Sequence, residues 1–268
     1  MRAIFDNKDK KMKKFFNVLT YLFTFLALQA VTGLLAGWLL PLIIGNPDIT
    51  TSQLLTVQAV SGVITLLIFH FAKWFTADRS YLSSRPRMAL LWSGMAAAGM
   101  IIPAEWIMEH MPELPNIAVE QFNILMTSPE GYLVVGLFAP IVEEVVFRGA
   151  ILRTLLEGSK NHWLIIAISA LVFSIAHFNP AQMPYTFVAG LLLGWMYYRT
   201  GSIMPGMVFH WVNNSVAFAV AFAVKNPDAK LTELFGSNAL LAVCFSLLIL
   251  VPSLIQLNIW LNDDYRKN

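Results

Sequence analysis

Long, unbroken apolar runs dominate this chain and restrict its possible folds more than any other feature. The first run, residues 15–44, already exceeds the roughly 20 residues that a transmembrane helix needs. The runs lack the alternation of apolar and polar residues that a membrane barrel requires. The sequence therefore predicts an all-α, polytopic transmembrane helical bundle of about eight spans, at residues 15–44, 54–75, 88–108, 131–156, 163–178, 183–198, 203–224 and 239–261.

The composition agrees with a membrane location and limits where chemistry can occur. Hydrophobic residues make up 57% of the 268 positions and charged residues only 13%, whereas soluble domains carry about 25% charged residues. The predicted spans leave no room for a soluble catalytic domain, so any chemistry must take place within the membrane. Cys244 is the only cysteine, which excludes an internal disulfide and a zinc site built from thiolates.

Basic residues are distributed unequally between the two predicted sides of the bundle. Fifteen of the 18 Lys and Arg residues lie before the first span, in the 73–87 and 153–160 connections, at Arg199 or in the C-terminal tail. Only Lys225 and Lys230 lie on the other side. Under the positive-inside rule, both termini are predicted to be cytoplasmic.

Three charged residues lie within the fourth apolar run, in the stretch A-P-I-V-E-E-V-V-F-R-G at residues 139–149. An ionised side chain at the centre of a membrane helix costs roughly 2.5–3.5 kcal/mol on translocon scales, so such residues usually serve a function. Glu144 and Arg148 are spaced i, i+4 with the acid first, which favours an ion pair on one helix face. Glu143 lies about 100° round the helix and has no predicted partner.

Pro140 precedes the two acids and cannot donate a backbone hydrogen bond. In an α-helix the carbonyl of Gly136 would then lack its partner, and we expect a kink just before Glu143. A simpler interpretation of the charges is a buried cluster that joins two helices and has no catalytic role. The sequence of this stretch alone allows both interpretations.

Two later runs carry a histidine at helical spacing from another residue. Phe173 and His177 lie four positions apart in the fifth span, and His210 and Asn214 lie four positions apart in the seventh, so each pair shares a helix face. Asn213 could take the place of Asn214. A single histidine in a span is more often a packing residue. Two histidines, an acid pair and an amide together, however, supply a base, a donor and an oxyanion clamp, which are the groups needed to hydrolyse an acyl group.

The ordered motifs E-E-x-x-x-R, F-x-x-x-H and H-x-x-x-N resemble the CPBP family of intramembrane proteases. This family includes CAAX prenyl proteases and proteins linked to bacteriocin processing or self-immunity. The resemblance covers about residues 130–224 and agrees with an eight-helix architecture. The matching residues are Glu143, Glu144, Arg148, Phe173, His177, His210 and Asn214.

The resemblance also implies a role for each motif residue and a division of the chain. It implies that Glu143 and His177 activate a water molecule and that His210 and Asn214 stabilise the oxyanion. Glu144, Arg148 and Phe173 would then support the structure. The expected parts are a basic cytoplasmic segment (1–14), spans one to three with an acidic external loop (15–130), a catalytic core (131–224), and a loop, eighth span and charged tail (225–268).

We therefore expect an intramembrane endopeptidase that hydrolyses a peptide bond with a glutamate-activated water and without a cofactor. Its expected partners are a membrane-associated protein or peptide substrate and the lipid bilayer, with no nucleic acid. We expect an integral, multi-pass protein of a bacterial cell (inner) membrane.

Two kinds of alternative remain open. Glu143, His177 and His210 could hold Zn²⁺ with water as the fourth ligand, although an asparagine at the fourth motif position suits an oxyanion donor better. The same buried charges could also serve a proton-relaying transporter or a non-catalytic scaffold, such as a bacteriocin self-immunity protein. A transporter should show paired repeats, and the sequence shows none.

Overall fold

The computed structural model describes residues 2–45, 50–75, 87–117, 125–126, 128–224 and 230–261. Most of these residues are helical, and the described ranges contain no strand, which confirms the all-α class. The segments are α1 (Arg2–Leu34), α2 (Leu40–Ile44), α3 (Thr51–Phe71), α5 (Met88–Glu109), α7 (Pro129–Gly131), α8 (Ala139–Glu143), α9 (Arg153–Leu156), α10 (His162–Ile175), α11 (Met183–Thr200), α12 (Met204–Val224), α13 (Leu231–Phe235) and α14 (Ala239–Trp260). Three π-helical segments, Leu35–Leu39, Tyr132–Phe138 and Glu144–Leu152, and a 3₁₀ turn, Gly236–Asn238, join some of them.

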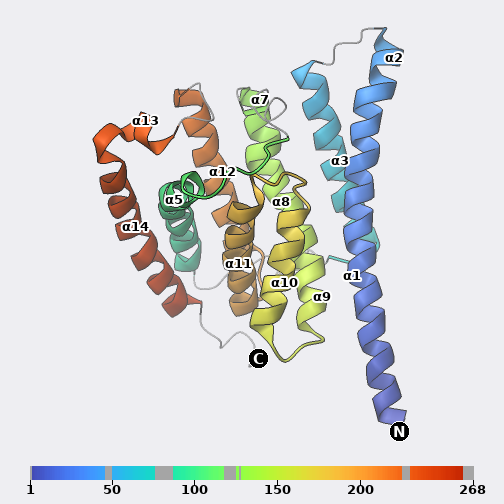
Figure 1. Cartoon of the computed structure of the whole chain (residues 1–268). Coiled ribbons are helices and arrows are strands. Elements are labelled where there is room, and N and C mark those ends of the chain that lie inside the picture. The colour runs from blue at the N-terminus through green and yellow to red at the C-terminus, as the bar shows by residue number, and fades with distance from the viewer. Residues whose placement is uncertain are drawn as a thin grey trace.

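The helices stand side by side in a bundle (Figure 1). α1 and α3 form one edge, α14 forms the opposite edge, and α10, α11 and α12 lie between them. α1 begins and α14 ends at the same end of the bundle. This arrangement suits an even number of membrane crossings. The eight-span count and the side on which the termini lie remain predictions.

Among the described residues, five helical stretches are long and apolar enough to cross a membrane, namely Met12–Ile44, Thr51–Phe71, Met88–Glu109, Met204–Ala223 and Leu231–Trp260. Their outward side chains are apolar as well, since Trp38, Leu42 and Leu248 are all exposed. Contiguous apolar surface of this kind is suited to lipid contact and would be unusual on a soluble protein. The chain is an integral, multi-pass membrane protein with an all-α bundle.

Small residues allow neighbouring helices to approach closely. A Cβ atom added to Gly99 of α5 would lie 2.6 Å from the backbone nitrogen of Leu250 on α14. A Cβ atom added to Gly190 of α11 would lie 3.0 Å from Ala170 of α10. Helix association in lipid depends on such packing because lipid tails are as apolar as the side chains. These glycines therefore hold α5 against α14 and α11 against α10.

The helical stretch that carries the two acids is interrupted by widened turns. Between α7 and α8 the turns are π-helical over Tyr132–Phe138, and the N–H of Ala139 donates to the carbonyl of Val134, five residues back. A second π-helical segment, Glu144–Leu152, follows α8. π-helical turns often occur at functional sites. The interruption predicted near Pro140 thus takes the form of a change in helical register.

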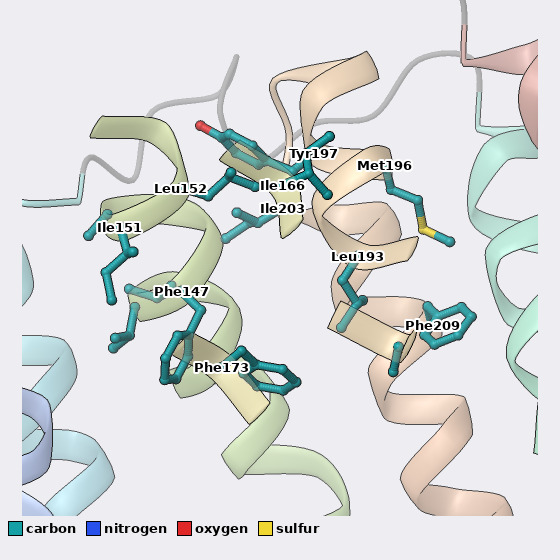
Figure 2. Packing of buried hydrophobic residues seen from close by; sticks show 14 of the residues in the cluster. Phe147, Ile151, Leu152, Ile166, Phe173, Leu193, Met196, Tyr197, Ile203 and Phe209 are labelled. Carbon is teal, nitrogen blue, oxygen red and sulfur yellow. The ribbon is translucent and has the colours of Figure 1, made fainter. Parts of the chain in front are cut away.

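The apolar core lies beside these acids. Phe147, Phe173, Leu193 and Phe209 are each at most 2% exposed and come together from the acid-bearing stretch, α10, α11 and α12 (Figure 2). The rings of Phe147 and Phe173 meet edge to face, with centroids 5.0 Å apart. Such aromatic pairs contribute about 0.5–1.5 kcal/mol beyond their buried area. The core therefore fixes the acid-bearing stretch against α10, and His177 follows in the turn after that helix.

Two helix ends differ from the sequence prediction. α1 begins at Arg2, so residues 2–14 are helical and continuous with the first predicted span, while the cytoplasmic location of segment 1–14 stays a prediction. α10 ends at Ile175 and not at Phe178, which leaves His177 in the turn after the helix. Phe178 has a positive φ of 51°, and a residue that precedes proline, as Asn179 does, disfavours helical backbone.

Several predicted features lie outside the described residues. These are residues 118–124 and 127 of the acidic external loop, the loop at 225–229 and the charged tail at 262–268.

Candidate active site

Glu144 and Arg148 form a buried ion pair. Their Oε1 and Nη1 atoms are 2.9 Å apart, and the side chains are 0% and 1% exposed. This contact confirms the pairing that the i, i+4 spacing predicted. The Arg148 guanidinium carbon also lies 4.2 Å from the centre of the Phe173 ring, which is within the range of a cation–π interaction. One of the two adjacent acids is therefore neutralised within the core.

His210 of α12 connects the two acids. Its Nδ1 lies 3.2 Å from Oε1 of Glu144, and its Nε2 lies 3.7 Å from Oε2 of Glu143. An ionised carboxylate can only accept a hydrogen bond, so the contact with Glu144 assigns a proton to Nδ1 of His210. The resemblance implied only that Glu144 supports the structure together with Arg148. The structure adds a second role, because Glu144 also orients His210.

Phe173 lies between the two histidines of the site. Its ring meets the His177 ring at 4.8 Å and the His210 ring at 5.9 Å, edge to face in both cases. Nδ1 of His177 is 2.8 Å from the carbonyl oxygen of Phe173. Because a carbonyl only accepts, Nδ1 carries a hydrogen in this contact, and Nε2 of a neutral ring remains free to accept one. The F-x-x-x-H spacing thus positions His177 through both the ring and the backbone of Phe173.

Asn214 is hydrogen-bonded to the backbone of the acid-bearing stretch. Its Nδ2 donates to the carbonyl of Val135 at 3.1 Å. In the π register set by the Ala139 to Val134 bond, the Val135 carbonyl would face the nitrogen of Pro140, which has no hydrogen. Asn214 therefore satisfies a carbonyl that Pro140 leaves without a helical partner. The amide nitrogen has two hydrogens, and this bond uses one of them.

The sequence analysis did not single out Tyr185 of α11. Its hydroxyl donates to Oδ1 of Asn213, and Nδ2 of Asn213 donates to Oδ1 of Asn214 at 3.3 Å. Asn213, considered as a substitute for Asn214, is therefore placed as its neighbour in a chain of hydrogen bonds. No sequence signal links Tyr185 to this chain, because the contact joins two helices.

Gly206 is the second residue that the sequence analysis missed. A Cβ atom at this position would lie 2.7 Å from Oε2 of Glu144 and 3.4 Å from Leu193. Only glycine leaves room for the carboxylate there. The signal was present in the sequence, because Gly206 precedes His210 by four residues and so lies on the same face of α12.

The four residues assigned to catalysis meet at one cavity. This cavity, of about 680 Å³, is lined by side chains that include Glu143, His177, His210 and Asn214. A pocket of this volume is in the range of small-molecule and peptide sites. Its rim also carries Glu105, Glu109, Glu113 and Lys230. A smaller cavity, of about 300 Å³, shares Glu143 and His177 with it.

The zinc alternative was tested against the positions of the side chains. Within the described residues, no three His, Cys, Asp or Glu side chains are placed to hold one metal ion. Nδ1 of His177 is engaged with the Phe173 carbonyl, which would leave Nε2 as the nitrogen available to a metal. As positioned here, Glu143, His177 and His210 do not form a zinc ligand set.

Comparison with known proteins concerns the same part of the chain. Residues 127–216 match the family model described as type II CAAX prenyl endopeptidase Rce1-like. The membrane-embedded CAAX protease MroQ of Staphylococcus aureus (strain USA300) is 29% identical over 106 residues. These residues are 37% of this chain, and the match spans only 42% of the length of that relative. No solved structure matches this chain.

The family match contains every residue of the three motifs, from Glu143 to Asn214. This part of the chain is therefore similar to CAAX prenyl endopeptidases, in agreement with the resemblance to the CPBP family. The matched residues include the acid-bearing stretch, α10, α11 and α12 as far as residue 216. The helices α1 to α5 and α13 to α14 lie outside the matched residues.

Proposed function

We propose that this protein is an intramembrane endopeptidase that hydrolyses a peptide bond with a water molecule activated by Glu143 and His177. The observation that carries the proposal is the meeting of Glu143, His177, His210 and Asn214 at one cavity inside the bundle. The family match and the name of the S. aureus relative support it. The resemblance to that relative also supports a bacterial cell membrane as the location.

Glu143 is the proposed general base. Its neighbour Glu144 is bound to Arg148 at 2.9 Å, which leaves Glu143 as the carboxylate of the pair that can accept a proton from water. Oε2 of Glu143 has no hydrogen-bond partner among the described residues. His177, whose Nε2 is free to accept, would hold the same water molecule from the side of α10.

His210 and Asn214 are the proposed stabilisers of the oxyanion. Because Nδ1 of His210 is bound to Glu144, His210 would donate through Nε2, which carries a hydrogen only when the ring is cationic. Both line the cavity with Glu143, and Asn214 has a second amide hydrogen beyond the one given to Val135. Donors placed where negative charge develops are worth about 10²–10³ in rate each. Glu144 and Arg148 would keep His210 in position, and Phe173 would keep both histidine rings in position.

The proposal is tested with purified protein in detergent and a mixture of synthetic peptides. The mixture contains membrane-soluble peptides and peptides with a C-terminal CAAX sequence, with and without a prenyl group, because the matched proteins carry that name. Wild-type protein should cleave some of them, and Glu143→Gln should not. Glu130→Gln is the matched control, since Glu130 is exposed and lines neither cavity. Equal cleavage by wild-type protein and Glu143→Gln would contradict the proposed role.

Metal dependence is tested on the same activity. Dialysis against a strong chelator should leave cleavage unchanged if the base is Glu143 acting on free water. Loss of cleavage that returns with added Zn²⁺ would instead make Glu143, His177 and His210 metal ligands. A rearrangement of these side chains around the ion would then be required.

A further inference from the structure

The smaller cavity lies on the side of the site that faces α1 and α3. Its walls carry Gln29 of α1 and Gln58 of α3, together with Glu143 and His177 of the proposed active site. The remaining lining residues are mostly apolar, among them Phe138. The two glutamines belong to none of the three motifs and lie outside the matched residues 127–216.

Both glutamines lie in helical stretches that can cross a membrane. Gln29 is exposed and Gln58 is partly buried, and within the described part of the chain neither carboxamide makes a hydrogen bond to another protein group. A polar group within the hydrocarbon region is unfavourable without such a partner, and polar residues there usually mark a functional site. Two carboxamides on neighbouring helices that line one cavity therefore indicate a ligand with its own donors and acceptors.

A peptide backbone fits this requirement. A carboxamide offers an N–H donor and a C=O acceptor, which match the C=O and N–H of a peptide bond. An acyl or prenyl chain offers neither group. The two cavities meet at Glu143 and His177, so a chain that runs from one into the other passes the residues that would attack it.

We propose that the smaller cavity is a peptide-binding subsite, in which Gln29 and Gln58 hydrogen-bond the backbone of the substrate on one side of the cleaved bond. The larger cavity holds the chain on the other side. This proposal rests on the proposed function, because it places the bond to be cleaved at Glu143.

Photocrosslinking to the Glu143→Gln variant tests the subsite without cleavage. The probe is a mixture of synthetic dodecapeptides with random apolar residues and one benzophenone-bearing residue at the centre. After irradiation in detergent, the crosslinked positions are mapped by mass spectrometry. Crosslinks are expected in both cavities, near Phe138 in the smaller one and near Thr186 in the larger one.

The glutamines are tested by adding Gln29→Leu and Gln58→Leu to that variant. Crosslinks in the smaller cavity should fall at least tenfold, while those in the larger cavity remain. Gln256→Leu is the matched control, since Gln256 lies in α14 and lines neither cavity. A second probe tests the same hydrogen bonds in the Glu143→Gln protein without changing either glutamine. The same peptides with N-methylated backbones should lose crosslinks in the smaller cavity, because they cannot donate to a carboxamide.

The outcomes separate the two proposals. Crosslinks in the larger cavity alone, or crosslinks near Phe138 that the glutamine variants do not change, would overturn the subsite and leave the proposed function in place. A benzophenone-labelled fatty acid that occupies the smaller cavity and displaces the peptides would also overturn it, in favour of a lipid. No crosslink to either cavity would contradict the endopeptidase proposal itself.

Discussion

Two adjacent glutamates have different environments because a helix turns by about 100° per residue. Glu144 faces the core, where its side chain is 0% exposed and contacts Arg148 and His210. The side chain of Glu143 is 22% exposed and lines both cavities. The first environment suits an acid that maintains the structure, and the second suits an acid that reacts.

Replacing each acid by glutamine should separate these roles. Glu144→Gln leaves the buried Arg148 charge without its partner, which typically costs about 3–5 kcal/mol. The thermal midpoint in detergent should therefore fall for Glu144→Gln and stay near wild type for Glu143→Gln. Replacement of Arg148 by Met in the Glu144→Gln protein should restore part of the loss. Equal midpoints for the two single variants would refute this division.

Gly206 supplies a second test at the scale of single atoms. In Gly206→Ala the added methyl group would lie 2.7 Å from Oε2 of Glu144, so the carboxylate that orients His210 has to shift. Cleavage should fall by about tenfold or more, since small displacements of site residues cost rate. Gly94→Ala is the control, because its nearest contact, Val212 of α12, would be an ordinary 3.4 Å. A similar loss in both variants would count against the mechanism.

At the scale of elements, the π-helical turns decide which backbone group needs a partner. In an α-helix Pro140 would orphan the carbonyl of Gly136, as expected from the sequence. In the observed π register Pro140 instead leaves the carbonyl of Val135 without a helical partner. Asn214 donates to this carbonyl at 3.1 Å. The position of Pro140 thus explains why an asparagine of α12 contacts the acid-bearing stretch.

A double-mutant cycle tests this link. Asn214→Ala should destabilise the protein by about 1 kcal/mol, because the partly buried carbonyl of Val135 loses its donor. Pro140→Ala supplies an N–H that can bond the same carbonyl, so Asn214→Ala should cost less in that background. Cleavage should not recover in the double variant if Asn214 also stabilises the oxyanion. Additive changes in the free energy of unfolding would show that the two residues are not linked.

Contacts between residues four positions apart along the chain could be predicted from the sequence, and contacts between helices could not. The Glu144–Arg148 pair and the packing of Phe173 against His177 follow from i, i+4 spacing. The contact of His210 with Glu144 depends on how closely α12 approaches, which Gly206 permits. Hydropathy predicts where each span begins and ends but not which spans pack together. The cavities between the helices therefore could not be predicted from the sequence.

For the whole molecule, two contacts identify the segments that lie at the two ends of the bundle. Lys14 of α1 donates to the backbone carbonyl of Glu157 at 2.9 Å and pairs with its carboxylate at 3.5 Å. The basic end of α1 therefore lies beside the turn between α9 and α10. At the other end of α10, the N–H of Ala181 donates to the carbonyl of Pro115 at 3.2 Å. The turn at Gly158 and the segment around Pro115 thus lie at opposite ends of the bundle.

This arrangement makes the topology testable with single cysteines. In a Cys244→Ser background, Glu113→Cys should react with a membrane-impermeant maleimide on intact cells, because residues 109–130 carry no Lys or Arg and are predicted to be external. Gly158→Cys should react only after the membrane is permeabilised, because it lies on the side where fifteen basic residues gather. Added to unfolded protein, the reagent should label both variants equally, which controls for reactivity. Labelling of Gly158→Cys on intact cells, with Glu113→Cys protected, would reverse the orientation. Equal labelling of both on intact cells would rule out a fixed orientation with these two segments on opposite sides of the membrane.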